Sequence, residues 1–187
     1  MKKTNSLFSN YLHEYATWTS ARAVQRGFTT TKNIKIAIEQ SGIEEFAKEF
    51  RNSTIDQSLF DNKHIELVKS LIESFHSLSK TKETEKAAFN IEKVTYGRMA
   101  KIIAIYLKTS VVIPNQGKGE LAKITHPPID AILLKALHDK IANKSLKLNK
   151  ITWTKLNESE YFELINKLRK TFILDYFWEL EQYWEAG

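Results

Sequence analysis

Three cations in the middle of the chain have the spacing of an anion-binding site. Arg98, Lys101 and Lys108 follow one another at i, i+3 and i+10, which brings them close in angle on a helix that is otherwise apolar. Gly97 just before them would let another backbone, such as a phosphodiester, come close. A helix N-terminus beside cations is also a ready anion site. These residues predict phosphate binding; the alternative is that they form the solvent-facing side of a core helix.

Asp130 is the second candidate, a carboxylate near the start of another predicted helix. Two prolines after His126 stiffen the approach to this helix and mark where it opens. Leu133 and Leu137 lie next to Asp130 in angle, so we expect the carboxylate to be partly buried. A buried carboxylate needs partners, and that combination often marks a working site. The alternative is a structural first-turn aspartate that holds backbone amides.

Arg22 and Arg26 are the third candidate, one helical turn apart near the N-terminus. They are two of only five arginines in a chain that otherwise uses lysine. The arginine fork suits bidentate contacts with phosphate or carboxylate. The alternative is a pair of buried ion pairs with acidic residues such as those near the C-terminus. A less favoured option is a small anionic ligand held by these two arginines and Arg98.

Charge is distributed unevenly along the 187 residues. Residues 80–150 hold 14 basic and 6 acidic side chains, a net charge of +8, whereas residues 158–187 hold 3 and 7, a net charge of −4. A basic segment is typical of proteins that bind the phosphate backbone. We therefore expect the segment 93–126, with Lys123 and His126, to join the nucleic-acid contacts. The polarity equally allows the chain's own acidic end to cover the basic centre.

Composition excludes several classes of protein. The chain is 42% apolar, with 4 Trp, 7 Tyr and 10 Phe, so it can build a core. With no cysteine there is no disulfide, no thiol chemistry and no cysteine-bound metal, and the five histidines lack zinc-ligand spacing. We therefore expect no metal and no cofactor. Apolar runs are too short to span a membrane, and the first residues lack a signal-peptide core, which predicts a cytoplasmic protein with no membrane partner.

The elements that must position these residues are helices. Gly and Pro are scarce, and apolar residues recur at helical rather than strand spacing. We predict an all-α fold, a single globular domain of about six to eight helices over 1–187, with a subdivision into 1–90 and 91–187 as an alternative. Capping residues, glycine stops and apolar stripes predict where the helices begin and end. In the N-terminal part, helices are expected from Phe8 to Arg26 with a stop at Gly27, from Thr31 to Gly42, over 44–50, and from a cap at Asp61 to Leu78. Further helices are expected over 95–109, from Pro127 to Ile141, and from a capping pair of Asn157 and Glu160 onward. Residues 79–86 and 143–150 are predicted to be a loop and a linker, and Val111 to Ile113 to be an isolated β-favouring run.

Two of these segments together resemble a known family. Residues 97–101, the apolar helix after them and the segment from Pro128 to Leu133 are similar to the catalytic segment of the helix-hairpin-helix DNA glycosylases, especially the 8-oxoguanine branch. In that family a glycine turn leads into a helix with an early lysine, and an aspartate opens a following helix. The chain departs from this pattern because Gly97 is the only glycine ahead of the lysine and because residues 113–126 form an inserted loop. The layout of the whole chain is also similar to a set of short uncharacterised bacterial proteins, a kinship that implies no function.

The glycosylase resemblance implies catalytic roles for two residues. Lys101 would form a Schiff base at the sugar C1′, and Asp130 would stabilise charge at the sugar of the departing base. A lysine nucleophile must lose its proton, which burial beside a cation such as Arg98 favours. Tyr96 or Tyr106 would provide a wall for a flipped base.

Two function classes follow from the sequence. The first is a nucleic-acid-binding helical protein with DNA as its partner, as a divergent base-excision enzyme or a relative that binds without cutting. The second is a non-enzymatic helical interaction or oligomerisation module, in which Lys101 and Asp130 form a structural pair with no cavity beside it and the chain forms a homo-oligomer.

Overall fold

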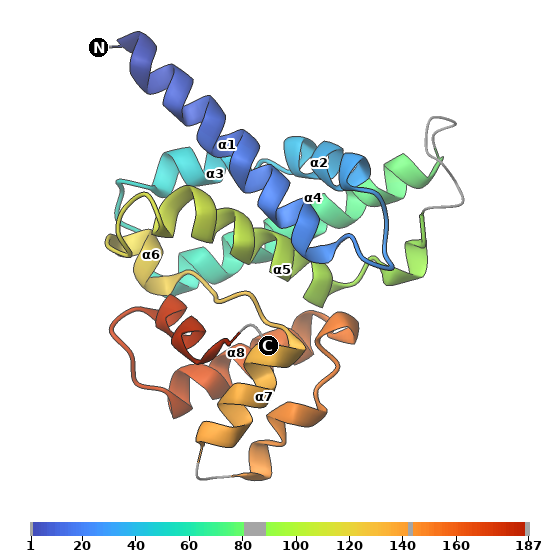
Figure 1. The fold of residues 1–187 in the computed structure, drawn as a ribbon, viewed down its shortest axis with the longest axis vertical. Coiled ribbons are helices and arrows are strands. Elements are labelled where there is room, and N and C mark those ends of the chain that lie inside the picture. Colours follow the sequence, from blue (N-terminus) through green and yellow to red (C-terminus); the bar gives the residue numbers. More distant parts are fainter. Residues whose placement is uncertain (1, 81–88, 142–143, 186–187) are drawn as a thin grey trace.

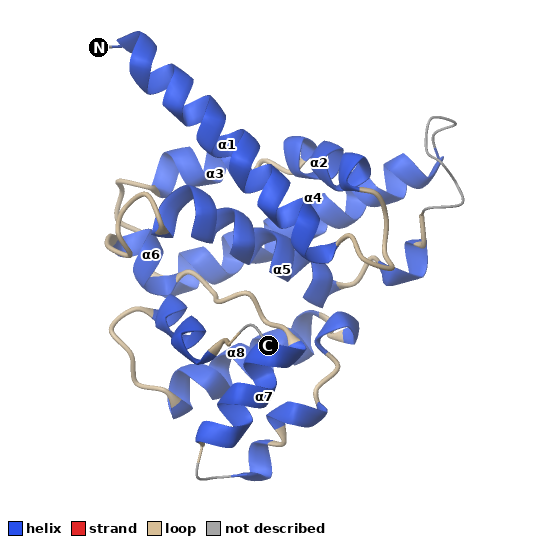
Figure 2. Cartoon of the chain, in the orientation of Figure 1, coloured by secondary structure: helices blue, strands red, loops and turns tan. Residues whose placement is uncertain are grey.

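The computed structural model describes residues 2–80, 89–141 and 144–185, and this part of the chain is all α-helical, as predicted (Figures 1 and 2). Short 3₁₀ turns connect the helices, and no strand is present in these residues. The α-helices are α1 (Lys2–Val24), α2 (Thr31–Gln40), α3 (Ile43–Phe50), α4 (Gln57–Lys80), α5 (Tyr96–Leu107), α6 (Glu120–Ile124), α7 (Ala131–Lys140) and α8 (Glu158–Thr171).

Helix α5 is the centre of the fold. It packs against α1 and α4, and nearly all of its residues are buried, as its apolar sequence predicts. Its packing on these two helices crosses the subdivision at residue 90 that the sequence suggested. The helix continues into a π-helical turn, Lys108–Val112, which takes up the β-favouring run at Val111. A run of three β-branched residues joined directly to a buried helix extends that helix, because tertiary packing outweighs the weak local preference.

Helices α7 and α8 lie with the C-terminal 3₁₀ helix Phe177–Tyr183 below α5 in the view of Figure 1. The turn that precedes α8 reaches the start of α5 at Gly97. A Cβ atom on Gly97 would lie 2.0 Å from the carbonyl oxygen of Trp153, so only glycine permits this approach. The Gly97 N–H also donates to the carbonyl of Leu156 at 3.0 Å. The backbone that approaches Gly97 closely is therefore that of the protein itself and not a phosphodiester.

Capping residues fix the helix ends as the sequence predicts in some places and differently in others. Asn157 and Glu160 form a reciprocal capping box at the start of α8, which confirms the predicted pair. Helix α1 ends at Val24, two residues before the predicted end at Arg26, and Gly27, with a left-handed φ of +65°, lies in the turn that follows. The cap of α4 is Asp56, whose Oδ1 accepts the Leu59 N–H at 2.8 Å, so the prediction that Asp61 caps this helix was wrong. The predicted loop over 79–86 and the linker that begins at 143 lie partly outside the described residues.

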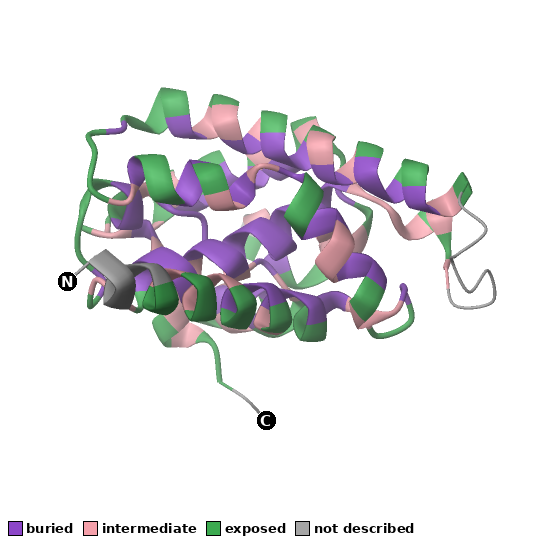
Figure 3. Ribbon diagram, turned by 90° about the horizontal axis from the view of Figure 1, so that it is seen from above, coloured by how far each residue is buried: buried purple, intermediate pink, exposed green. Residues whose placement is uncertain are grey.

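Helix α1 presents an apolar face to solvent. Its N-terminal half projects beyond the other helices, and exposed residues line its outer side (Figures 1 and 3). The side that packs on the body carries small residues such as Ala16, Ser20 and Ala21. The larger apolar and aromatic side chains of this helix lie on the opposite side, and the exposed ones include Phe8, Tyr11, Tyr15 and Trp18. None of the helices in the described ranges combines the length and the apolar character needed to cross a membrane.

Candidate functional site

Lys101 and Asp130 meet in the structure, although 29 residues separate them. The Lys101 Nζ atom lies 3.0 Å from the Asp130 Oδ2 atom, and the two side chains are 10% and 14% exposed. Lys101 reaches this position from the second turn of the buried helix α5. The indole of Trp153 covers the amine from one side, with the ring centroid 4.7 Å from Nζ. The sequence therefore named two residues that form one ion pair.

Asp130 is the N-cap of α7 rather than a residue of its first turn. Pro127 and Pro128 precede the helix in extended chain, and Asp130 takes an extended φ of −147°. Its Oδ1 atom accepts the Leu133 N–H at 2.9 Å, the usual bond of a capping aspartate. Its Oδ2 atom accepts from Lys101 and, at 3.2 Å, from the indole N–H of Trp184. Cap and ion pair together hold the carboxylate in one orientation.

The ion pair lines a cavity of about 380 Å³. A cavity of this size falls within the range of small-molecule sites. Its wall contains two cations and two carboxylates at close quarters, together with apolar groups; the lining residues are Ala23, Lys101, Ile105, Lys108, Thr109, Pro128, Asp130, Glu181 and Trp184. Tyr96 and Tyr106 do not line it. Both are buried and bonded elsewhere, to His64 and His13, so the prediction that one of them walls this site was wrong.

The acidic C-terminal segment closes one side of this cavity. Glu181 forms an ion pair with Lys108, and Trp184 bonds to Asp130. Earlier in the same segment, the indole N–H of Trp178 donates to the carbonyl of Gly117 at 3.1 Å, which fixes the segment on the loop before α6. Burial raises the pKa of the Glu181 carboxyl, against the lowering effect of Lys108, and the nearby charge of Asp130 raises it further. The acidic end of the chain thus covers part of the basic centre within the same molecule.

Arg98 does not point into the cavity. Its guanidinium lies over the rings of Phe28 and Trp153, with ring centroids 5.4 and 5.9 Å away, and it is half-buried. The predicted anion site at the start of α5 is also closed, because Gly97 bonds to the chain's own backbone and the Arg98 N–H bonds to the side chain of Thr95. Of the three predicted cations, Lys101 and Lys108 line the cavity, whereas Arg98 contacts Trp153, the ring that covers the Lys101 amine.

The other three basic residues that the sequence singled out, Arg22, Arg26 and Lys123, lie on the surface. Arg22 and Arg26 are exposed, and neither has an ion-pair partner within the described ranges, so the alternative of buried ion pairs does not hold. Arg22 is in the last turn of α1, one residue before Ala23 of the cavity wall. Lys123 is exposed at the end of α6 and does not line the cavity.

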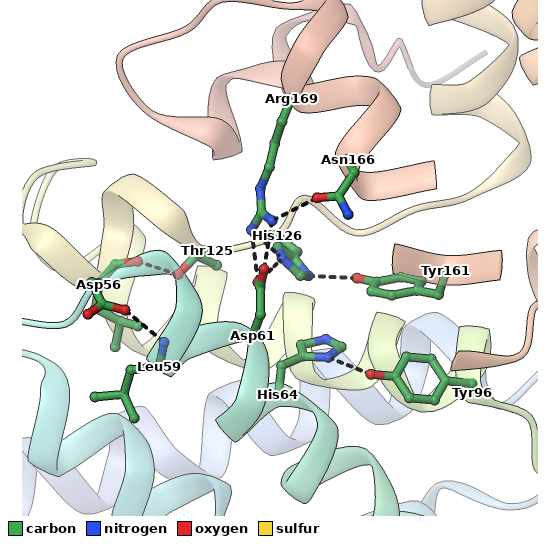
Figure 4. A network of polar contacts seen from close by, with 11 residues as sticks. Asp56, Leu59, Asp61, His64, Tyr96, Thr125, His126, Tyr161, Asn166 and Arg169 are labelled. Atoms are coloured by element: carbon green, nitrogen blue, oxygen red, sulfur yellow. Dashed lines mark hydrogen bonds and ion pairs between the residues drawn. The ribbon is translucent and has the colours of Figure 1, made fainter. Parts of the chain in front are cut away.

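His126 is buried, so it cannot contact a nucleic acid on the surface, and that prediction is corrected. Its Nδ1 atom lies 3.0 Å from the Tyr161 hydroxyl, and its Nε2 atom lies 2.9 Å from Arg169 Nη2 and 3.1 Å from Asp61 Oδ1 (Figure 4). Burial lowers the pKa of the His126 imidazole to about 4. Both ring nitrogens are thus within hydrogen-bond distance of partners, Nδ1 of Tyr161 and Nε2 of Asp61 and Arg169.

Asp61 and Arg169 are the residues of this network that the sequence did not reveal. The Arg169 guanidinium holds both oxygens of Asp61, at 2.8 and 2.9 Å. Burial alone would raise the pKa of the Asp61 carboxyl, but hydrogen bonds from Arg169 and His126 hold it well below its usual value. The one available signal was that Arg169 is an arginine in a lysine-rich chain. The network joins α4, α8 and the segment before α7, and we assign it to the stability of the fold.

Within the described ranges, no group of three or more His, Asp or Glu side chains is placed to hold a metal ion. Comparison with protein-family models, with curated proteins and with solved structures finds no match to this chain.

Proposed function

We propose that the protein binds DNA and that Lys101 and Asp130 form a reactive pair of the base-excision type. The observation that supports the proposal is the 3.0 Å contact between these two side chains on the wall of a 380 Å³ cavity. A structural ion pair needs no cavity beside it, whereas a nucleophile and its proton acceptor need one. The resemblance of the two segments to the helix-hairpin-helix glycosylases names the same two residues.

The proposed reaction begins with proton transfer from the Lys101 ammonium to Asp130, its nearest acceptor. The neutral amine then attacks C1′ of a nucleotide whose base lies in the cavity. A C–N bond to Lys101 forms while the C1′–N bond to the base breaks, and the base leaves with the bonding electrons. Asp130 returns its proton to the departing base, which restores its charge beside the cationic sugar. The attached amine loses a proton and the sugar ring opens to give the Schiff base.

The other groups on the wall fit this proposal. Pro128 and the Trp184 indole offer apolar surface for a flat base, and Lys108 offers a cation for a phosphate. In this conformation Glu181 neutralises Lys108, so entry of a phosphate requires the C-terminal segment to give up that ion pair. The basic segment 80–150 supplies the long-range attraction for DNA.

The second candidate function is a non-enzymatic interaction module. Three donors satisfy the Asp130 carboxylate, the N–H groups of Leu133 and Trp184 and the Lys101 amine, which is also the pattern of a structural residue. On this view the pair fastens α5 to α7, and the acidic C-terminal segment serves as an internal partner of the basic centre.

Release of a base from DNA separates the two candidates. The protein is incubated with single-stranded and duplex oligonucleotides that carry a single 8-oxoguanine or an undamaged guanine, and free base is measured. The proposal expects release that Lys101→Met abolishes. Lys170→Met, which removes an exposed cation outside both the cavity and the basic segment 80–150, should leave release within twofold. Equal release by the Lys101→Met variant and the wild type would contradict it. An absence of any release together with an absence of salt-sensitive DNA binding favours the interaction module.

A further inference from the structure

The outer face of α1 carries a row of aromatic rings. Tyr15 and Trp18 are 59% and 45% exposed and stack on each other, with ring centroids 5.8 Å apart and planes 21° apart. Phe8 and Tyr11 continue the row toward the N-terminus and are equally open to solvent. Steps of three or four residues place these rings about 4.5–6 Å apart along the helix axis. Nothing in the described part of the chain covers them.

Arginines extend this row at its C-terminal end. At 3.6 residues per turn Arg22 falls within the same arc as the aromatic residues, and Arg26 follows just after the helix. Both guanidinium groups are exposed and lack an ion-pair partner in the ranges that the structure describes. Residues 1–26 hold four basic residues and a single acid, Glu14. The face is therefore aromatic along its length and cationic at one end.

This face leads to the cavity of Lys101 and Asp130. The hydroxyl of Thr19 lies 3.2 Å from that of Thr109, which lines the cavity, and Ala23 of α1 lines it as well. Trp18 and Arg22 are the sequence neighbours of these two α1 residues. A chain of nucleotides lying along α1 would therefore reach the cavity at the C-terminal end of the helix.

We infer that the aromatic face of α1, formed by Phe8, Tyr11, Tyr15 and Trp18 and extended by Arg22 and Arg26, binds a single-stranded nucleic acid. Its rings stack on successive bases and its arginines hold the phosphates next to the cavity. Stacking on aromatic rings requires bases whose faces are open, which a single strand offers and an intact duplex does not. The inference rests on the proposed function in placing the strand beside Lys101 and Asp130, and it adds the strandedness of the substrate.

Charge favours this occupant over a second copy of the chain. A second copy brings an α1 of the same positive charge, and the first 13 residues contain no acid that could lie opposite Arg22 in an antiparallel pair. A nucleic acid instead brings the opposite charge to the arginines. An aromatic and basic face also suits an anionic membrane surface, but only a nucleic acid uses both the ring spacing and the neighbouring cavity.

The test is the binding of a fluorescent oligothymidylate to the full chain at low and rising salt. We expect Tyr15→Ala and Trp18→Ala each to weaken binding about tenfold, since stacking of one base is lost. The pair Arg22→Gln and Arg26→Gln is expected to reduce the slope of log affinity against log salt by about 1.4. Matched controls are Ile173→Ala, an apolar side chain that is 96% exposed elsewhere, and the exposed pair Lys155→Gln and Lys170→Gln, which lies outside the basic segment 80–150. These controls should leave the affinity within about twofold.

Other outcomes overturn the inference. It falls if the α1 variants, folded by circular dichroism, bind the oligonucleotide as the wild type does. It also falls if light scattering shows a wild-type dimer that Trp18→Ala converts to a monomer while oligonucleotide binding is absent, or if the chain binds phosphatidylserine vesicles and no oligonucleotide. Lys101→Met separates it from the proposed function. That variant should lose base release and keep oligothymidylate binding, whereas the α1 variants weaken binding even where no base is released.

Discussion

Asp130 holds the start of α7 with one carboxylate oxygen and the amine of Lys101 with the other. Because Oδ1 accepts the Leu133 N–H, the carboxylate is held at the helix end independently of its contact with the lysine. Lys101 in turn extends from the buried helix α5, and Trp153 covers its amine. A proton donor and a proton acceptor are thus held 3.0 Å apart by two helices that the core fixes relative to each other. This rigidity serves a reactive pair and a structural pair equally, so variants must separate the roles.

Replacement of Asp130 separates capping from charge pairing. Asp130→Asn keeps an oxygen for the Leu133 N–H but loses the charge that faces Lys101, whereas Asp130→Ala loses both. We expect Asp130→Ala to be less stable than Asp130→Asn by about 1 kcal/mol, the usual value of an N-cap. Urea unfolding of the two variants measures this difference. Equal stabilities would show that the Oδ1 bond contributes nothing to α7.

Gly97→Ala tests the contact between α5 and the turn that precedes α8. The added methyl group would lie 2.0 Å from the backbone oxygen of Trp153, and no side-chain movement can relieve this clash because the contacted atom belongs to the backbone. We expect a loss of about 1–3 kcal/mol, the range for overpacking, measured by urea unfolding. Gly42→Ala is a different kind of control, because nothing lies within 4 Å of its added methyl group and only its φ of +79° opposes the change. An unchanged stability for Gly97→Ala would contradict the close approach.

Arg169→Met tests the network around Asp61. The variant removes both guanidinium bonds and leaves the Asp61 carboxylate half-buried beside the buried ring of His126. A loss of about 3 kcal/mol is expected, since the cost arises from the unpaired charge. Addition of Asp61→Asn to this variant should recover part of the loss. Lys170→Met, an exposed neighbour, should change the stability by less than about 0.5 kcal/mol. A loss of unfolding free energy no larger than that of the control would show that the network does not stabilise the fold.

Acid should destabilise the protein between pH 6.5 and about 4. Burial lowers the pKa of His126 to about 4 and also holds the pKa of His64 well below its usual value of 6.5. The unfolded chain therefore binds protons in this range that the folded chain excludes, and stability is complete above pH 6.5 and falls as the pH drops. His126 alone accounts for about 3 kcal/mol over this window. Asp61, whose pKa is also lowered, adds to the loss only below about pH 4.

Urea unfolding at a series of pH values measures this dependence. Glu181 acts in the opposite sense, because burial raises its pKa and the folded chain then binds the extra proton first. The net dependence is expected to follow the two histidines, which are both fully enclosed. A free energy of unfolding that stays constant from pH 7 to pH 4.5 would show that the folded state protonates these rings as readily as the unfolded chain does.

The helical class and several helix ends were predictable because their causes are local. The capping box of Asn157 and Glu160 and the left-handed turn at Gly27 depend on residues within one turn. Asp61 was mistaken for a cap because Asp56 and Asp61 look alike in sequence, and the partner that distinguishes Asp61 is Arg169, 108 residues away. Long-range pairing of this kind leaves no periodic signal.

The candidate site was predictable in its central pair but not in its surroundings. Lys101 and Asp130 were named from their types and settings, and the fold brings them together. His126 was placed among the surface contacts because it lies in a basic segment, whereas Phe60 and Tyr161 from distant helices enclose it. Gly97 correctly indicated a close backbone approach, but the sequence could not say whose backbone approaches.

Borohydride trapping tests the central claim most directly. The wild type and Lys101→Met are incubated with single-stranded and with duplex DNA that each carry one 8-oxoguanine. A Schiff base is reduced to a stable amine, and the adduct is mapped by mass spectrometry. The account predicts a covalent adduct on Lys101 in the wild type and none in the variant. An adduct of equal yield in the variant, or no adduct under conditions in which the wild type binds the DNA, would contradict it.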